Sequence, residues 1–167
     1  MRALRCLLTA LLMIPVAASS AQKSAPIVVD KIVVLKSAHS MTLYAGGRSL
    51  KVYRVALGTG PGNAKQKRGD HETPEGNYVI DSRNANSKFH LALHVSYPNA
   101  TDRVRAKKLG VDPGGEIMIH GLPAGYSWLG RAQVIADWTD GCIALTNAEM
   151  DEVWKLAPTG TPVEIRH

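Results

Sequence analysis

Apolar and polar residues alternate along much of the chain, with the period of two that is typical of half-buried β-strands. The pattern is clearest over residues 50–57, where Tyr53, Val55 and Leu57 occupy one set of alternate positions. The predicted strands cover residues 32–35, 41–44, 50–57, 77–81, 89–96, 116–119 and 162–165. Because turns rich in glycine and proline separate many of these segments, the pattern predicts a mainly β domain.

Helical periodicity is clearest over residues 147–157. Thr146 is a suitable N-cap for this helix, and Glu149 three residues later completes a capping box. Pro158 and Gly160 end the helix. A second, shorter helix with a basic face is predicted over residues 102–109. The sequence therefore predicts a mainly β fold with one or two helices.

The first 21 residues have the composition of a secretory signal peptide. Arg2 and Arg5 precede an apolar run over residues 6–16, and Ser19 and Ala21 form a small-x-small cleavage site. The apolar run is too short to span a bilayer as a stable helix, although an uncleaved membrane anchor is the alternative interpretation. We therefore expect an exported protein of the periplasm or cell envelope. Residues 22–27 would form a flexible lead-in, and residues 28–167 a single domain.

The net charge of the chain excludes few classes of binding partner. The formal net charge is +6, and removal of the signal would take away two of the positive charges. The densest basic stretches, residues 65–68 and 103–108, have no interleaved aromatic residues of the kind that single-strand binders use. Solvated surface is therefore the favoured interpretation, and we expect no nucleic-acid partner. The sequence predicts no particular oligomeric state.

The chain contains two cysteines, and removal of the signal would leave only Cys142. A single cysteine in an exported protein is a free thiol or an intermolecular bridge. A catalytic thiol needs a base, and His120 is a candidate at the end of a predicted strand. Gly121 after it would allow close approach of another backbone, and Gly141 would leave room for N–H groups facing an oxyanion. The alternative is a buried structural cysteine and a hydrogen-bonded histidine.

The amino-acid sequence around Cys142 and His120 favours a catalytic role for these two residues. His120-Gly121 on a predicted strand, followed by Thr139-x-Gly141-Cys142, resembles the signature of the L,D-transpeptidase catalytic domain, the YkuD-type family. The upstream segments 58–60 and 73–76 resemble early parts of the same domain. The resemblance covers roughly residues 28–165 and implies an L,D-transpeptidase-like β-sandwich or barrel.

The resemblance implies roles for individual residues. Cys142 would be the nucleophile and His120 the general base and acid. Thr139 would fix the site by hydrogen bonding, and Gly141 with Cys142 would offer backbone donors. Many members of the family have arginine two residues after the cysteine, where this chain has Ala144. That departure affects the expected substrate more than the chemistry.

The implied activity is L,D-transpeptidation of peptidoglycan stem peptides through a thioester on Cys142, in cell-wall cross-linking or remodelling and hence cell shape. No cofactor is implied. One alternative is a hydrolase of the same bond, either an L,D-carboxypeptidase or a peptidase that releases wall-linked proteins. A second is a non-catalytic wall-binding module in which Cys142 is structural.

Three further sets of residues are candidates for the site. Four histidines, at positions 71, 90, 94 and 120, suggest zinc, but residues four apart on a strand lie about 13 Å apart. That separation is too large for His90 and His94 to share an ion with bonds of about 2 Å, so no metal site is predicted. Asp140 is a candidate to orient His120, although a solvated loop acid is favoured because a backbone carbonyl orients an imidazole equally well. The candidate residues for the substrate cleft are Trp138, Trp128, Tyr97 and His94.

Overall fold

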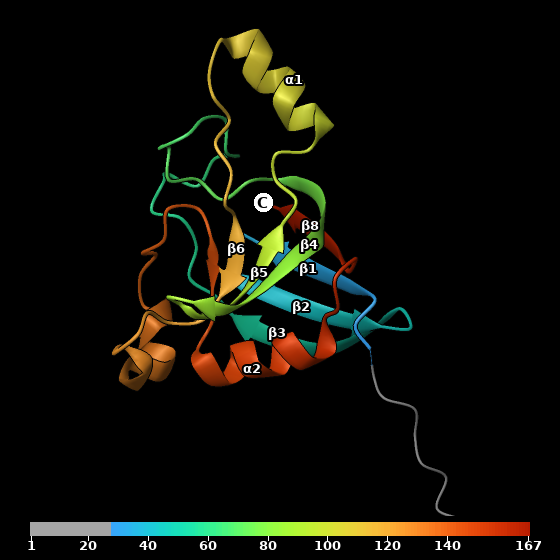
Figure 1. The fold of residues 1–167 in the computed structure, drawn as a ribbon, viewed down its shortest axis with the longest axis vertical. Coiled ribbons are helices and arrows are strands. Elements are labelled where there is room, and N and C mark those ends of the chain that lie inside the picture. Colours follow the sequence, from blue (N-terminus) through green and yellow to red (C-terminus); the bar gives the residue numbers. More distant parts are fainter. Residues whose placement is uncertain (1–27) are drawn as a thin grey trace, which may run out of the picture.

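The computed structural model describes residues 28–167 (Figure 1). The predicted signal peptide and lead-in, residues 1–27, lie outside this part. Within the described residues, no helix is both long enough and apolar enough to cross a membrane.

One curled sheet forms the body of the domain. Its strand order is β3-β2-β1-β8-β4-β5-β6-β7. The strands are β1 (Lys31–Leu35), β2 (Ser40–Ala45), β3 (Arg48–Arg54), β4 (Gly76–Ser87), β5 (His90–Val95), β6 (Met118–His120), β7 (Ile143–Ala144) and β8 (Pro162–Arg166). The helical segments are α1 (Ala100–Leu109), the 3₁₀ segment η1 (Ser127–Val134) and α2 (Asn147–Leu156).

The two ends of the sheet meet. Just beyond β3, Ala56 pairs with Ala144 of β7 in an isolated antiparallel bridge. The Ala144 N–H donates to the Ala56 carbonyl at 2.8 Å, and the Ala56 N–H donates to the Ala144 carbonyl at 3.1 Å. Because this bridge joins the first strand in the sheet order to the last, the sheet approaches a barrel. The predicted mainly β sandwich or barrel is therefore confirmed.

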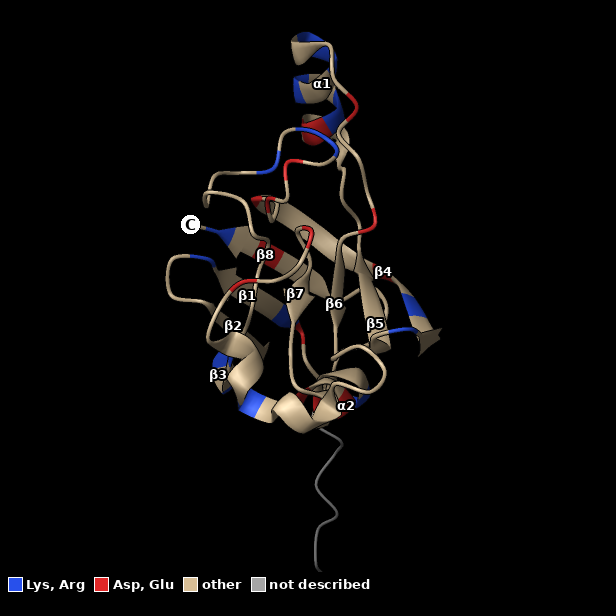
Figure 2. Cartoon of the chain, turned by 90° about the vertical axis from the view of Figure 1, so that its left-hand side faces the viewer, with Lys and Arg blue, Asp and Glu red and all other residues tan. Residues whose placement is uncertain are grey.

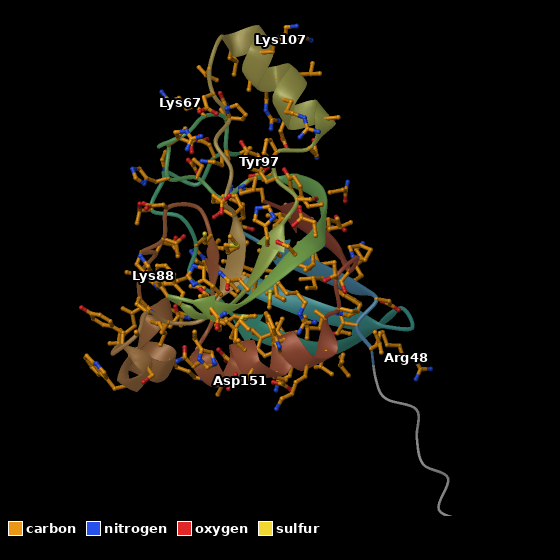
Figure 3. The ribbon with its side chains drawn as sticks, viewed as in Figure 1. Arg48, Lys67, Lys88, Tyr97, Lys107 and Asp151 are labelled. Carbon is orange, nitrogen blue, oxygen red and sulfur yellow. The ribbon has the colours of Figure 1, made fainter. Side chains whose placement is uncertain are left out.

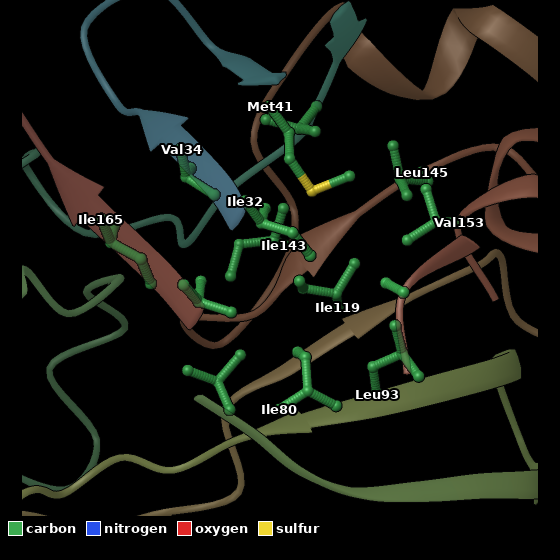
Figure 4. Packing of buried hydrophobic residues seen from close by; sticks show 14 of the residues in the cluster. Ile32, Val34, Met41, Ile80, Leu93, Ile119, Ile143, Leu145, Val153 and Ile165 are labelled. Carbon is green, nitrogen blue, oxygen red and sulfur yellow. The ribbon is translucent and has the colours of Figure 1, made fainter. Parts of the chain in front are cut away.

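The core lies inside the curl of the sheet and under α2 (Figure 4). Ile32 of β1, Leu93 of β5 and Ile143 of β7 are all fully buried there. Helix α2 packs against β5, and in Figure 1 it runs along one side of the sheet while α1 projects from the opposite end. Met150 and Val153 are the buried residues of α2.

Some element boundaries differ from the sequence predictions. Strand β3 ends at Arg54, because the backbone of residues 55–57 leaves β2 and bonds to other segments, including Ala144. Strand β4 extends to Ser87, because the polar residues after 81 form an antiparallel ladder with β5. Helix α1 begins at Ala100, capped by Asn99. The segment η1 was not predicted.

Candidate active site

Strands β6 and β7 bring the histidine and the cysteine together. They are parallel, with Ile119 opposite Ile143 and His120 opposite Ala144. Cys142 directly precedes β7. Since alternate residues of a strand share a face, this register places Cys142 on the face that carries His120. The predicted strand before His120 is present and delivers the histidine at its last residue.

Cys142 and His120 line the same cleft, whose volume is about 430 Å³. Segments from several parts of the chain contribute to it. The other lining residues are Ser87, Phe89, Gly115, Glu116, Met118, Trp138, Thr139 and Asp140. Three of the predicted site residues beyond the Cys–His pair, Thr139, Trp138 and Asp140, are therefore at the cleft.

The ring of His120 has a defined tautomer. Its Nδ1 lies 2.7 Å from the carbonyl oxygen of Gly121. A carbonyl only accepts hydrogen bonds, so Nδ1 carries the proton and the lone pair is on Nε2. Burial lowers the pKa of His120, and the hydrogen bond to Gly121 opposes that shift only partly. The imidazole is thus suited to act as a neutral base.

Two aromatic side chains cover His120. The ring of Phe89 lies 4.7 Å from the imidazole, measured between centroids, and the ring of Trp138 lies 5.7 Å away in an edge-on arrangement. Only 4% of the His120 surface is exposed. This shielding is the physical reason for the lowered pKa of His120, because a buried imidazolium loses its hydration.

Cys142 is a free, partly buried thiol. Its Sγ lies 3.5 Å from the carbonyl oxygen of Glu116 and donates a weak hydrogen bond to it. Burial raises the pKa of the Cys142 thiol, a backbone hydrogen bond from Met118 opposes part of this rise, and the nearby carboxylates of Asp140 and Glu116 make smaller contributions that raise the pKa. The thiol is therefore neutral at rest and needs a base for ionisation.

Thr139 holds the loop before Cys142. Its hydroxyl donates to the carbonyl of Cys142 at 2.9 Å and accepts from the N–H of Gly141 at 3.2 Å. Its own backbone bonds to Leu57 and Thr59. Because the Gly141 N–H is engaged by Thr139, only the Cys142 N–H of the two expected backbone donors is left to face an oxyanion.

Both glycines of the predicted site sit where another atom approaches closely. Gly141 has φ +119°, and a Cβ there would lie 2.4 Å from the Glu72 carbonyl oxygen. A Cβ on Gly121 would lie 2.7 Å from the Asn147 side-chain oxygen, which accepts a hydrogen bond from Leu122. Larger residues at either position would push the cysteine loop or the histidine strand away from its support.

Asp140 does not orient His120. Its side chain is 88% exposed, and its carboxylate pairs with Nδ1 of His71 at 2.7 Å. The Gly121 carbonyl occupies the place of the orienting acceptor at His120.

Three residues predicted for the cleft do not line it. Tyr97 is buried in the core, where its hydroxyl donates to the Pro113 carbonyl at 2.9 Å; Figure 3 shows it beneath α1. His94 pairs with Asp81 on the neighbouring strand β4. Trp128 lies on η1 with 76% of its surface exposed. These three placements were wrong because they depend on how distant segments pack.

Three of the four candidate histidines pair individually with acids. His71 pairs with Asp140, His90 with Asp151 and His94 with Asp81. Among residues 28–167, no group of three or more histidine, cysteine, aspartate or glutamate side chains is arranged to hold a metal ion.

Among the residues that sequence reasoning missed, two make contacts that shape the site. Phe89 covers His120, as described above. Gln133 is buried on η1, where its amide donates to the Ala144 carbonyl at 3.2 Å and accepts from Trp138 Nε1 at 3.0 Å. Gln133 thus connects η1, the cleft wall and the strand after Cys142. No signal in the sequence distinguishes it from a surface glutamine.

A family model and several known proteins match this chain. The family model of the L,D-transpeptidase catalytic domain, YkuD, matches residues 29–165. YafK of Escherichia coli K12, named as a candidate L,D-transpeptidase, is 29% identical over 110 residues. That match covers 65% of this chain and 36% of YafK, so the chain spans about a third of that relative.

Solved structures of similar fold come from several bacteria. Pgp2 of Campylobacter jejuni, a helical cell shape determining protein, superposes with TM-score 0.65 at 25% identity, over 83% of this chain and 48% of Pgp2. Bd1075 of Bdellovibrio bacteriovorus superposes with TM-score 0.58 at 20% identity, over 84% of this chain and 48% of Bd1075. The second likeness extends to the fold alone.

Proposed function

Because this chain belongs to the L,D-transpeptidase catalytic domain family, we propose that it is an exported cysteine acyltransferase acting on peptidoglycan stem peptides. The observation that carries the proposal is the shared cleft of Cys142 and His120, in which the imidazole presents an unprotonated Nε2. A structural cysteine would have no need of a neutral, shielded base beside it.

In the first half of the reaction, Cys142 attacks the amide carbonyl of the L-centred third residue of the stem. Both side chains are neutral at rest, so His120 Nε2 takes the thiol proton as the sulfur–carbon bond forms. The same proton then passes to the amine of the departing terminal D-alanine when the carbon–nitrogen bond breaks. We assign stabilisation of the oxyanion to the Cys142 N–H.

In the second half, an amine of another stem attacks the thioester. His120 accepts a proton from that amine and returns it to the Cys142 sulfur as the carbon–sulfur bond breaks. Phe89 and Trp138 keep bulk water from the imidazole, which favours capture of the thioester by an amine.

Export and a role in the cell wall complete the proposal. The signal-like residues 1–21 support transport to the periplasm or cell envelope, where peptidoglycan lies. The similarity to Pgp2, named for its determination of cell shape, supports wall remodelling as the process.

The test is mass spectrometry of purified wall fragments incubated with residues 22–167 and with a Cys142→Ala variant. New cross-links between third residues, or stems with an exchanged terminal amine, are expected with the native protein and absent with the variant. Lys107→Gln, an exposed change on α1, is the matched control and should behave as the native protein. Shortened stems without new linkages would indicate that the protein is a hydrolase and not a transferase. If no change in the wall fragments depends on Cys142, the wall-binding module becomes the favoured interpretation.

A further inference from the structure

Helix α1 projects from one end of the sheet and contributes little to the core (Figure 1). Only Asp102 and Ala106 are buried among its ten residues. With about 3.6 residues per turn, the opposite side of the helix carries positions 103, 104, 107 and 108, and all four are exposed. We call these residues, Arg103, Val104, Lys107 and Lys108, the α1 face.

The α1 face is basic and has no acid beside it on the helix. Asp102 is the one acid of α1, and it is buried and paired with Arg105. Figure 2 shows basic residues spread along α1. Among residues 28–167, no ion pair involves Arg103, Lys107 or Lys108. These three positive charges therefore attract an anionic partner without competition from a neighbouring carboxylate.

The first turn of α1 is held in place by Asp102. Its carboxylate accepts a hydrogen bond from the Asn99 backbone N–H at 3.0 Å, and the Asn99 side chain accepts from the Asp102 N–H at 3.1 Å. The same carboxylate accepts from the hydroxyl of Tyr78, a buried residue of β4, at 3.0 Å. Helix α1 is therefore capped and tied to the sheet before any partner arrives. A rigid face of this kind binds without the entropic cost of ordering a loop.

Apolar side chains lie among the charges of α1. Val104 of the α1 face is 55% exposed, and Leu109 at the end of the helix is 52% exposed. Leu109 lines a cavity of about 400 Å³ together with Lys67, so the end of the helix lies beside a further exposed lysine. A hydrated anionic polymer gains nothing from exposed apolar side chains. The boundary of an anionic lipid bilayer attracts cations and also takes up apolar side chains.

We propose that α1 is a peripheral docking surface for an anionic lipid bilayer. The cations of the α1 face lie at the lipid phosphates, and Val104 enters the boundary between headgroups and acyl chains. Because few charges contribute, attachment is weak, reversible and sensitive to salt. The chain that returns from α1 leads to Gly115 and Glu116 of the catalytic cleft, so docking holds that cleft near the membrane surface. This inference goes beyond the proposed function and requires no turnover.

Sedimentation with lipid vesicles tests the proposal. Residues 22–167 are used, because the apolar run over residues 6–16 would itself bind lipid. One set of vesicles is phosphatidylcholine, and the other is an equal mixture of phosphatidylcholine and phosphatidylglycerol. The protein should sediment with the anionic vesicles at low salt and be released in about 1 M salt, where charges are screened beyond about 3 Å. Equal binding to both kinds of vesicle, or binding to neither, would overturn the proposal.

Paired variants locate the contact. Lys107→Gln combined with Lys108→Gln should lower the affinity for anionic vesicles about 25-fold, or about fivefold for each charge. The matched control is Arg48→Gln combined with Lys88→Gln, which removes two exposed charges far from α1 (Figure 3). The control pair should leave the affinity unchanged. An equal loss in the two pairs would show that net charge alone attracts the protein, and would contradict docking through α1.

An arm with soluble polyphosphate separates a bilayer from an anionic polymer. Val104→Ser should lower the affinity for anionic vesicles about threefold, because the bilayer boundary takes up the valine, and should not alter the affinity for polyphosphate. Polyphosphate binding as tight as vesicle binding, with no effect of Val104→Ser on either, would make the partner a polymer and overturn the bilayer. Cys142→Ala protein should bind vesicles as the native protein does, so the result stands or fails apart from any transferase activity.

Discussion

His120 donates a hydrogen bond from Nδ1 to the carbonyl oxygen of Gly121, the residue that follows it in the chain. The orienting acceptor of the imidazole is therefore backbone. A carboxylate in that place would stabilise the imidazolium and raise the pKa of His120. A carbonyl fixes the tautomer and leaves burial as the dominant influence, which lowers the pKa.

This arrangement predicts how kcat/KM depends on pH on the acid side of neutrality. Only neutral His120 accepts the thiol proton, and a lowered pKa keeps the ring neutral to lower pH. We expect kcat/KM to rise with pH through a midpoint below about 6.5, the ordinary histidine pKa, and to be flat near neutrality. Initial rates measured over a range of pH with a stem tetrapeptide give this midpoint. A midpoint above about 7 would contradict a neutral resting imidazole.

Removal of the aromatic cover should move that midpoint. Phe89 lies against His120, so Phe89→Ala admits water to the ring and makes the imidazolium less unfavourable. The pKa of His120 then rises toward about 6.5, and the acid limb of kcat/KM shifts to higher pH. NMR titration of His120 measures the shift directly. Phe89→Leu, which retains most of the apolar cover, should shift the midpoint less; an equal shift in both variants would exclude shielding as the cause.

The hydroxyl of Thr139 should matter to both stability and rate. Thr139→Val keeps the shape but leaves the Gly141 N–H and the Cys142 carbonyl without their partner. We expect a loss of about 1–3 kcal/mol in the free energy of unfolding and at least about a tenfold fall in kcat/KM. Chemical denaturation and steady-state kinetics check the two effects. Thr139→Ser is the matched control, because it restores the hydroxyl and should recover most of both losses.

Gly141 should tolerate no side chain. Gly141→Ala strains a backbone with positive φ and places a Cβ against the Glu72 carbonyl. Gly62 also has positive φ, but a Cβ there meets nothing within 4 Å. Gly62→Ala should therefore cost about 1–3 kcal/mol from backbone strain alone, and Gly141→Ala about 1–3 kcal/mol more. Thermal unfolding compares the two. Equal costs would show that the close approach to Glu72 is unimportant.

Local signals in the sequence were sufficient for several of the regular elements. The Thr146–Glu149 capping box forms as predicted, since both partners belong to one helical turn. The strand that ends at His120 was also predicted, because its short apolar run lies between a turn and His120-Gly121. The fold family followed from the resemblance of two short motifs to a known family signature, and the family comparison confirms it.

Long-range packing accounts for what was missed. Gln133 is polar, and its apolar neighbours Ala132 and Val134 do not themselves predict its burial, yet Ala144 and Trp138 both bond to its amide. Tyr97 follows a strand directly and resembles a rim residue, but the return of the chain from α1 brings Pro113 over it. Trp128 lies within the interval between the histidine and the cysteine, and only the course of η1 turns it outward.

Because Ala56 and Ala144 form a bridge between the two ends of the sheet, the reactivity of the Cys142 thiol depends on completion of folding. The strand after Cys142 is held on one side by β6 and on the other by the chain beyond β3, and each neighbour is remote in sequence. A chain whose sheet has not closed would carry the thiol without an aligned imidazole. For a protein that we propose crosses a membrane before it acts, chemical competence would then arise only after the sheet closes at its destination.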